Sequence, residues 1–418
     1  MQETLQEKTL IPKRDEMVSI IQKTLKPVRR TESIPFYSAS GRVCAEDVFS
    51  SNILPNYLSS RFDGITVRYA DFENGPPDTS RWTPGEEYAY GNTGIAMPDG
   101  YDTLIAIEDV TIRAIGIEIH KQPEYRGQMV NPVGENMQKG ERLIAKGTVV
   151  TPAHVGLFAA GGILQVNVYA RPRIGIIPTG NELVPPTPSV PLRKNVDSNS
   201  YMIAAYLSDW GAEPTSYPIA PDDPPAIAAA VQKALAENDA AIIIAGSSLG
   251  TKDYTIRVMH KLGDVVVPEL AHGPGRKSSL SVIGGKPVLG IAGPPLGAQI
   301  TCDLYLSPFV SALRGLPHVK MQTLEVICDD AFISHGVDFC ERVHIYRAPD
   351  GYHARASFSP KTTRAQMQAL SQGNFYRAAG TQCEPGERTT VELLCPVEYL
   401  PDHDEMNEIL GKDVQPYE

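Results

Sequence analysis

The segment from Ala240 to Thr255 reads AAIIIAGSSLGTKDYT and indicates how the central part of the chain folds. Its first residues are apolar and rich in isoleucine, which is typical of a strand buried on both faces of a parallel sheet. The turn at 246–250 is rich in glycine and serine, and its backbone N–H groups are suited to an anion. Asp253 follows where the apolar spacing becomes helical. The segment predicts a strand, a ligand-binding turn and a helix, although an ordinary strand-to-helix connection has the same pattern.

Strands and helices alternate in the same way over residues 173–316. RIGIIPTGNEL, from residue 173, predicts a strand that ends in a Thr-Gly turn, and GIAGPP at 290–295 predicts another strand and turn. This alternation is typical of a three-layer α/β domain with a parallel sheet. Because parallel strands end at one edge of their sheet, we expect Glu182 and Asp253 to share a cleft. Two carboxylates there are suited to a magnesium ion that bridges to a phosphate.

The parts of the chain on either side have other patterns. Residues 14–25 carry apolar side chains at helical spacing, whereas Pro and Gly interrupt residues 76–150 every few positions and leave short alternating runs. Residues after 318 again read as short strands and turns, which predicts a small β-domain, a barrel. The predicted domains are an N-terminal discontinuous domain (1–50 with 142–172), a β-rich insertion (51–141), an α/β domain (173–317) and a C-terminal β-barrel (318–418).

The composition excludes several classes of protein. The chain has 418 residues, of which 42% are hydrophobic and 21% charged, as in a globular protein of several domains. A net charge of −11 argues against general nucleic-acid binding. No apolar run approaches the roughly 18 residues that span a bilayer, and the polar N-terminus does not read as a signal peptide. We therefore expect a soluble cytoplasmic protein.

The cysteines and histidines form no recognisable metal motif. Six scattered cysteines, none in a C-x-x-C pair, favour buried free thiols over a zinc site or a disulfide scaffold. His335, His344 and His353 recur every nine residues, but the segment reads as strands and turns. We interpret that spacing as a coincidence.

Six segments carry recognisable motifs, in order over nearly the whole chain. They are SSRFDGITVRYADF (59–72), NTGIAMPDGYDTLIAIEDV (92–110), PTGNELV (178–184), VDSNSYMIAAYLSDWGAEP (196–214), AGSSLGTKDYT (245–255) and GIAGPPLGAQI (290–300). These segments resemble motifs of the molybdopterin molybdenumtransferases, the family of MoeA and the gephyrin E-domain. Each motif alone is weakly specific, whereas six in the family's order are a strong resemblance. The predicted division into four domains also agrees with the family's layout.

The resemblance implies an activity and a site. Such enzymes insert molybdate into the dithiolene of adenylylated molybdopterin and hydrolyse the adenylate with help from magnesium, and they are homodimers. By motif position, the implied catalytic residues are Asp63, Thr93, Glu182 and Asp253, of which Glu182 and Asp253 hold the metal. The residues implied to bind the pterin or its anions are Thr179, Gly180, Asp197, Ser198, Gly246, Ser247, Ser248, Gly250, Arg276, Lys277, Gly293 and Pro295.

The sequence departs from the family pattern at several of these motifs. A family aspartate is Asn181 here, which weakens metal affinity because a charge is lost. An arginine and an acid of another motif, a lysine of the anion-binding loop and a proline of the last motif are also replaced; the residues at these positions are Asn131, Asn136, Gly273 and Ala292. Tungstate in place of molybdate, and the enzyme that receives the product, are left open by the sequence.

Two other functions therefore stay open beside the transferase. One is a catalytically altered paralogue that binds or carries the pterin cofactor or scaffolds a partner protein, because a fold does not fix a function. The other is a different phosphate-ester ligand on the same scaffold. The site residues also have plain structural alternatives, as turn formers (Asp63, Thr93), a solvated turn acid (Glu182), a helix N-cap (Asp253) and a solvated loop (Arg276 and Lys277).

Overall fold

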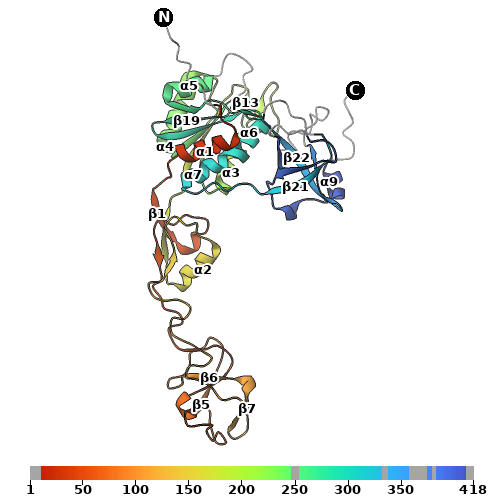
Figure 1. Cartoon of the computed structure of the whole chain (residues 1–418). Helices are drawn as coiled ribbons and strands as arrows, with labels where there is room; N and C mark the ends of the chain where they lie inside the picture. Colours follow the sequence, from red (N-terminus) through yellow and green to blue (C-terminus); the bar gives the residue numbers. More distant parts are fainter. Residues whose placement is uncertain (1–10, 246–253, 332–337, 357–373, 379–382, 411–418) are drawn as a thin grey trace. The chain divides into compact units, whose positions relative to one another are not determined.

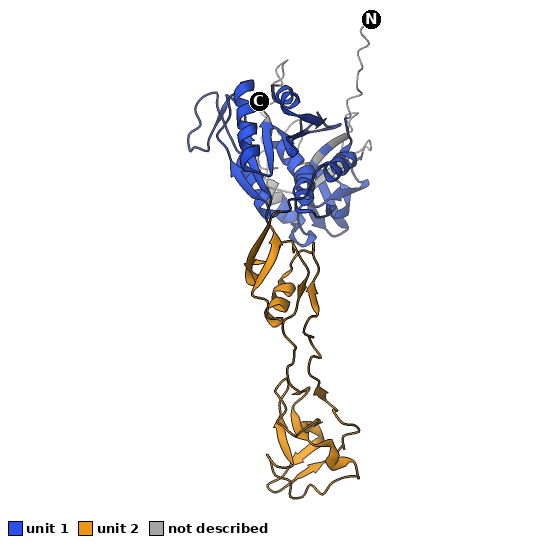
Figure 2. Cartoon of the chain, turned by 90° about the vertical axis from the view of Figure 1, so that its left-hand side faces the viewer, with its two compact units in different colours: residues 1–29, 170–418 blue, residues 30–169 orange. Residues whose placement is uncertain are grey.

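The computed structural model describes residues 11–245, 254–331, 338–356, 374–378 and 383–410. The chain divides into two compact units, shown in different colours in Figure 2. Unit 1 contains Met1–Arg29 and Ala170–Glu418, and unit 2 contains Arg30–Tyr169. Each unit has hydrophobic cores of its own and is described by itself below.

A six-stranded sheet forms the centre of unit 1 (Figure 1). Its first four strands are parallel, whereas the last two run antiparallel to their neighbours. The fully parallel sheet expected from the sequence is therefore wrong at this edge, because Gly284 and Gly285, both with positive φ, connect two of the strands in a tight hairpin. In spatial order the strands are β15 (Glu213–Ser216), β12 (Arg173–Pro178), β16 (Ala240–Ala245), β20 (Lys286–Ala292), β19 (Ser279–Ile283) and β17 (Asp264–Val267).

Helices pack on both faces of this sheet. Successive side chains of a strand point to opposite faces, so Ile242 and Ile244 enter one hydrophobic core while Ile243 enters the other. The prediction of a strand buried on both faces is thus confirmed. The helices are α1 (Arg14–Thr24), α3 (Asn199–Asp209), α6 (Pro295–Thr301) and α7 (Ser307–Arg314) on the first face, and α4 (Pro224–Glu237) and α5 (Tyr254–Leu262) on the second.

A π-helical segment, Cys302–Leu306, joins α6 to α7 without a break. After it, Phe309, Val310 and Leu313 of α7 are buried in the first core, where Met17 and Ile21 of α1 also lie. The N-terminal helix therefore packs on the α/β sheet of unit 1. No helix in the described part of the chain has both the length and the apolar character that crossing a bilayer requires.

A second sheet of unit 1 lies toward the C-terminus and has its own core around Val326, Val343 and Val391. The strands pair in the order β22–β23–β21–β25–β24, and β24 also pairs with β22, while β18 adds in parallel to β22. The bounds are β18 (His272–Gly273), β21 (Thr323–Cys328), β22 (Asp338–Ala348), β23 (Gly351–Ala356), β24 (Asn374–Ala378) and β25 (Arg388–Glu392), followed by a 3-10 turn (Val397–Tyr399) and α9 (His403–Leu410).

A disulfide links Cys328 to Cys383 in this second sheet. The expectation that all six cysteines are thiols is therefore wrong for these two, whereas Cys44, Cys302 and Cys340 are buried as thiols are expected to be. The two sulfurs belong to residues 55 positions apart, and backbone hydrogen bonds of Cys328 with Gly386 and Glu387 bring the segments together. Sequence spacing alone carries no sign of that pairing.

Unit 2 contains short strands, as the repeated Pro and Gly predicted. One core surrounds Phe158 and Val168, next to β1 (Thr31–Pro35), β2 (Val48–Phe49), β10 (Arg142–Ile144), α2 (Pro152–Ala160) and β11 (Gln165–Tyr169). Another core surrounds Ile65 and Ile105, in which β4 lies between β5 and β6. The remaining elements are β3 (Ser59–Ser60), β4 (Gly64–Val67), β5 (Tyr88–Gly91), β6 (Thr103–Ala106), β7 (Val110–Ile112), β8 (Ile117–Ile119) and β9 (Val130–Asn131), with 3-10 turns at Phe36–Ser38, Tyr69–Phe72 and Ile107–Asp109.

Candidate functional site

A pocket of about 450 Å³ opens at the carboxyl ends of the parallel strands β12, β16 and β20 in unit 1. Ligands of open α/β sheets bind at this edge, since the exits of several strands converge there. Its walls also include two short parallel strands, β13 (Leu183–Val184) and β14 (Asn195–Val196), and the start of α3. The lining residues are Thr179, Glu182, Leu183, Asn195, Val196, Asp197, Ser198, Asn199, Ile244, Gly293, Pro294 and Pro295.

The turn after β12 places Glu182 in this pocket. The backbone N–H and the hydroxyl of Thr179 both donate to the carbonyl of Ile244, at 3.1 and 2.8 Å, and so tie the exits of two strands together. Gly180 has a φ of 149°, and a Cβ there would lie 2.8 Å from both carboxylate oxygens of Glu182. The carboxylate is therefore folded back over a position that only glycine fits.

The start of α3 forms the facing wall. Asp197 is only 6% exposed, and its Oδ1 accepts a hydrogen bond of 3.1 Å from the N–H of Ser200. The side-chain amide of Asn199 donates to the carbonyl of Gly293 at 2.7 Å, which ties α3 to the turn after β20. Sequence reasoning did not single out Asn199, although it stands next to Asp197 and Ser198 in the same quoted motif.

The pocket is acidic. Within the described part of the chain, Glu182 and Asp197 are its two ionisable lining residues, and none of the lining residues there is a lysine, arginine or histidine. Thr179, Ser198, Gly293 and Pro295 line the same space, so six of the residues selected from the sequence meet here, while Gly180 supports Glu182 from behind. Asp253, Gly246, Ser247, Ser248 and Gly250 lie outside the described residues, and the expected meeting of Asp253 with Glu182 stays a prediction.

The predicted anion-binding loop, residues 273–277, lies beside α6, the helix that follows the pocket turn at Gly293. A Cβ on Gly275 would be 2.8 Å from Thr301 Oγ1 in α6, so the loop packs tightly against that helix. Arg276 and Lys277 do not line the pocket, and both are mostly exposed. Each approaches a carboxylate oxygen of Glu269, at 3.2 and 3.4 Å. One acid thus neutralises part of their charge, which sequence spacing did not indicate.

Unit 2 brings Asp63 and Thr93 together. Asp63 Oδ1 accepts hydrogen bonds from the backbone N–H of Thr93 at 2.8 Å and from its hydroxyl at 3.0 Å. The backbone hydrogen bond, followed by that of the hydroxyl, lowers the pKa of the exposed Asp63 carboxyl below its ordinary value. The residue after Asp63 must be a glycine, because a Cβ on Gly64 would lie 2.1 Å from the carbonyl oxygen of Ile105. The turn therefore presents a charged carboxylate at the surface of this unit.

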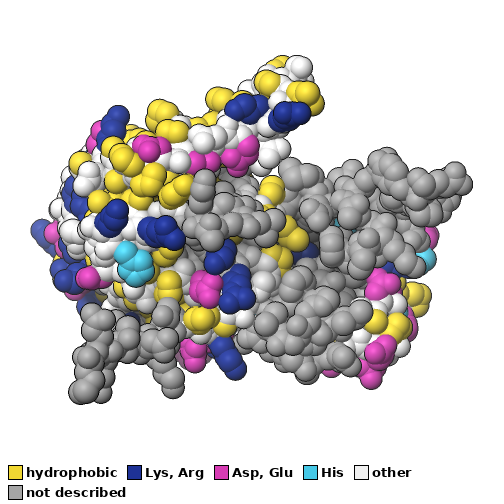
Figure 3. Space-filling model, turned by 90° about the horizontal axis from the view of Figure 1, so that it is seen from above, with side chains coloured by type: hydrophobic (Ala, Val, Ile, Leu, Met, Phe, Trp, Pro, Cys, Tyr) yellow, Lys and Arg dark blue, Asp and Glu magenta, His cyan; other side chains and the backbone are white. Residues whose placement is uncertain are grey.

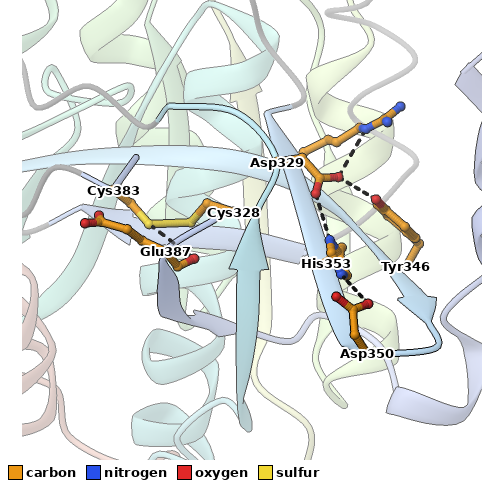
Figure 4. A network of polar contacts seen from close by, with 8 residues as sticks. Cys328, Asp329, Tyr346, Asp350, His353, Cys383 and Glu387 are labelled. Atoms are coloured by element: carbon orange, nitrogen blue, oxygen red, sulfur yellow. Dashed lines mark hydrogen bonds and ion pairs between the residues drawn. A yellow bond between two sulfur atoms is a disulfide. The ribbon is translucent and has the colours of Figure 1, made fainter. Parts of the chain in front are cut away.

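Another polar network lies in the C-terminal sheet (Figure 4). Asp329 accepts hydrogen bonds from Tyr346 at 2.5 Å and Arg355 at 3.2 Å, and pairs with His353 at 2.8 Å. The other ring nitrogen of His353 lies 2.9 Å from Asp350. Burial alone would lower the pKa of His353, but the two carboxylates raise it above its ordinary value. The nine-residue histidine spacing had been set aside, so sequence reasoning missed this network.

The carboxylates of Asp329 and Asp350 already contact His353, Arg355 and the phenol of Tyr346. We therefore interpret this network as structural. Among the described residues, no group of three or more His, Cys, Asp or Glu side chains is arranged to hold a metal ion. The pocket of unit 1, where the described lining holds two carboxylates and no cation, is therefore the stronger ligand site.

Comparison with known proteins shows which family the chain belongs to. Residues 13–162 match the family described as MoeA N-terminal region (domain I and II), and residues 175–312 match the probable molybdopterin binding domain. The molybdopterin molybdenumtransferase of Nostoc sp. is 31% identical over 309 residues, covering 68% of this chain and 70% of the relative. The chain belongs to the molybdopterin molybdenumtransferase family.

Other members of the molybdopterin molybdenumtransferase family support the same conclusion. The Haemophilus influenzae enzyme of that name is 27% identical over 298 residues, covering 68% of this chain and 74% of the relative. A crystal structure of the molybdopterin biosynthesis MoeA protein of Pyrococcus horikoshii aligns with a TM-score of 0.75 and 25% identity, covering 93% of this chain and 100% of that chain. The acidic pocket lies within the residues matched to the molybdopterin binding domain.

Proposed function

We propose that this protein is a molybdopterin molybdenumtransferase, which inserts molybdate or tungstate into adenylylated molybdopterin and releases AMP with the help of magnesium. The observation that carries the proposal is the pocket at the strand ends, where carboxylates from two separate segments line one space. That pocket lies in the part of the chain matched to a probable molybdopterin binding domain. The names of the relatives supply the substrate class and the reaction.

The residues of the pocket fit a magnesium ion. Mg²⁺ is usually bound through one or two carboxylates together with substrate phosphates, and Glu182 and Asp197 supply two carboxylates without a competing cation among the described lining residues. We infer that these two residues, with Asp253, would hold the ion. When bound, it would offset the negative charge that a phosphoanhydride and an oxyanion bring together.

The chain itself would bind, orient and move protons. The backbone N–H groups of Thr179 and Gly180 donate to Ile244 and Ala220, so this turn holds the wall of the pocket rather than the phosphates. Glu182, which lines the pocket, would orient a water and take its proton. Asp63 would act as a charged acceptor, since Thr93 lowers its pKa. The turn after β20 ends in Pro294 and Pro295, which shape the pocket wall but offer no N–H donor.

Further features belong to the proposal through the family resemblance. We propose a cytoplasmic homodimer whose chain has four domains, with the boundaries predicted from the sequence. The cyclic order of strand pairings in the C-terminal sheet supports the β-barrel proposed for residues 318–418.

A catalytically altered paralogue that binds or carries the pterin is the second candidate. It is favoured by the anion-binding loop, where Arg276 and Lys277 are both engaged with Glu269 rather than free for a phosphate. Asn181, which replaces a family aspartate, is also occupied: its backbone N–H donates to Asp222 and its carbonyl accepts from Lys194.

One assay separates the two candidates. The protein is incubated with adenylylated molybdopterin, magnesium and molybdate, and AMP and molybdenum-loaded pterin are measured. Release of AMP that the substitution Asp253→Ala abolishes supports the transferase. Tight pterin binding without AMP release supports the carrier, and failure to bind any pterin contradicts both.

A further inference from the structure

An exposed arm, residues 185–194, stands at the rim of the pocket. It reads PPTPSVPLRK and connects β13 to β14, and every residue in it is exposed. Four prolines fix φ at their positions and make such a segment semi-rigid. Both ends of the arm are pocket walls, because Leu183, Asn195 and Val196 line the pocket. Figure 3 shows a narrow projection at its upper edge that carries hydrophobic and Lys or Arg side chains.

Hydrogen bonds fix the end of the arm nearest the pocket. The ammonium group of Lys194 donates to the carbonyl of Asn181 at 2.6 Å, next to Glu182, and the backbone N–H of Lys194 donates to Pro191 at 3.1 Å. Arg193 lies inside the resulting turn with a φ of 63°, in the left-handed region. A residue with a side chain costs about 1–2 kcal/mol there, so the turn is held by its surroundings rather than by local preference.

The basic side chains near the pocket differ in whether they already have an acidic or carbonyl partner. The described lining of the pocket has two acids and no cation, and the two basic residues of the neighbouring loop, Arg276 and Lys277, are paired with Glu269. Lys194 is engaged with Asn181. The guanidinium of Arg193 forms no hydrogen bond or ion pair with any other described residue. A phosphate-bearing ligand needs positive charge, and among the described residues at the pocket rim Arg193 is the basic side chain that remains available for it.

We propose that Arg193 binds a phosphate group of the ligand at the mouth of this pocket and sets the preference for phosphate-bearing ligands. Arg193 is two residues from Asn195 of the lining, a separation of about 7 Å of extended chain, which the length of an arginine side chain bridges. The planar guanidinium offers two parallel N–H groups to two oxygens of one phosphate, a geometry that lysine cannot supply. This inference rests on the pocket of the proposed function and names a residue for it that the sequence motifs do not include.

The decisive variant is Arg193→Gly in the full chain. Glycine accepts the left-handed φ, so this variant removes the side chain while it keeps the turn. Arg193→Lys keeps the charge without the bidentate geometry, and Lys320→Gln, an exposed cation outside the pocket lining, is the matched charge control. Thermal melting of each variant verifies folding, and we expect Arg193→Gly to melt no lower than the wild type.

Two measurements are made on each variant. The KM for adenylylated molybdopterin is measured in the AMP-release assay, and the Kd of AMP with magnesium is measured by calorimetry at two salt concentrations. We expect Arg193→Gly to raise both constants about tenfold with little change in kcat, to flatten the salt dependence, and Arg193→Lys to lie in between. Lys320→Gln is expected to leave both unchanged.

The outcomes separate this inference from the proposed function. If the wild type releases no AMP but its affinity for AMP falls tenfold in Arg193→Gly, the transferase proposal fails and the role of Arg193 stands. If AMP is released and Arg193→Gly matches the wild type in both constants, the role of Arg193 is overturned and the transferase stands. An equal loss in Lys320→Gln, or a wild type that does not bind AMP, also overturns it.

Discussion

The pocket of unit 1 and the Asp63–Thr93 turn of unit 2 present carboxylates in opposite surroundings. Asp197 is buried, Glu182 is half-buried, and none of the described residues that line the space between them is a cation. Asp63 is exposed, and two hydrogen bonds from Thr93 already keep it charged. The pocket is thus ready to receive a positive ion or an ionic ligand by itself. The Asp63–Thr93 turn presents a charged carboxylate in a fixed position, where a ligand can contact it.

The Asp329 network gives a third case, because its acid is surrounded by donors. Tyr346, His353 and Arg355 all contact that one carboxylate. The three regions together indicate that the partners of an acid, more than its presence, decide whether it acts on a ligand or on stability. The following predictions test that rule, from the largest expected effect to the smallest.

Glu182→Gln should have the largest effect. The side chain keeps its size but loses the charge and the proton acceptor, so AMP release should fall by about a hundred- to a thousandfold, as for a missing general base. Stability should change little. Glu213→Gln, an exposed acid on β15, is the control and should be fully active. Wild-type rates for Glu182→Gln would remove the basis for treating the pocket as the reaction site.

Thr93→Ala tests the turn of unit 2, with an intermediate effect. Loss of the hydroxyl donor should raise the pKa of Asp63 back toward the ordinary value of about 3.9. The lowered pKa means that Asp63 contributes stability above its unfolded pKa, and that this contribution is lost as the pH falls through its folded pKa. In Thr93→Ala the contribution should therefore be smaller, and its loss should be complete at a higher pH than in the wild type.

Carboxyl ¹³C resonances followed through an acid titration measure this shift. Asp63→Asn, which keeps the size of the side chain but removes its charge, should lower AMP release by roughly tenfold, the effect of losing one transition-state interaction. Asp99→Asn, another exposed turn acid of unit 2, is the control. If the two asparagine variants behave alike, the turn has no role beyond structure.

His353→Gln should leave activity unchanged and affect stability alone. The carboxylates of Asp329 and Asp350 raise the pKa of His353, so its contribution is fully present below the unfolded pKa of about 6.5 and is lost as the pH rises through the folded pKa. Denaturant unfolding should show a loss of about 1–3 kcal/mol near pH 6 that shrinks at pH 9. His260→Gln, on the exposed side of α5, is the control. A loss that is the same at both pH values would contradict the charge argument.

Much of the α/β architecture followed from local pattern. The run through Ile242, Ile243 and Ile244 is apolar because both faces of its strand are covered. The sequence alone therefore predicts a strand that is buried on both faces. The antiparallel edge was missed because Gly284 and Gly285 were not recognised as a hairpin turn. The disulfide was missed because two cysteines distant in sequence give no local signal.

The candidate site was predicted less completely. Strand-exit rules brought Thr179, Glu182 and Gly293 to one edge, and the structure places them in one pocket. The hydrogen bond between Asp63 and Thr93 depends on the pairing of β4 with β5 across 30 residues, which turn chemistry alone does not reveal. The engagement of Arg276 by Glu269 likewise needs the folded loop, because a list of charges does not say which ones meet.

The π-helical segment Cys302–Leu306 makes the chain sensitive to length at one place. A π turn accommodates an extra residue within a helical path. If the same residues formed a regular α-helix, the extra residue would no longer be absorbed and α7 would turn by about 100° relative to α6. Phe309 and Leu313 would then face away from α1. The proline arm at 185–194, whose residues are all exposed, has no such constraint on its length.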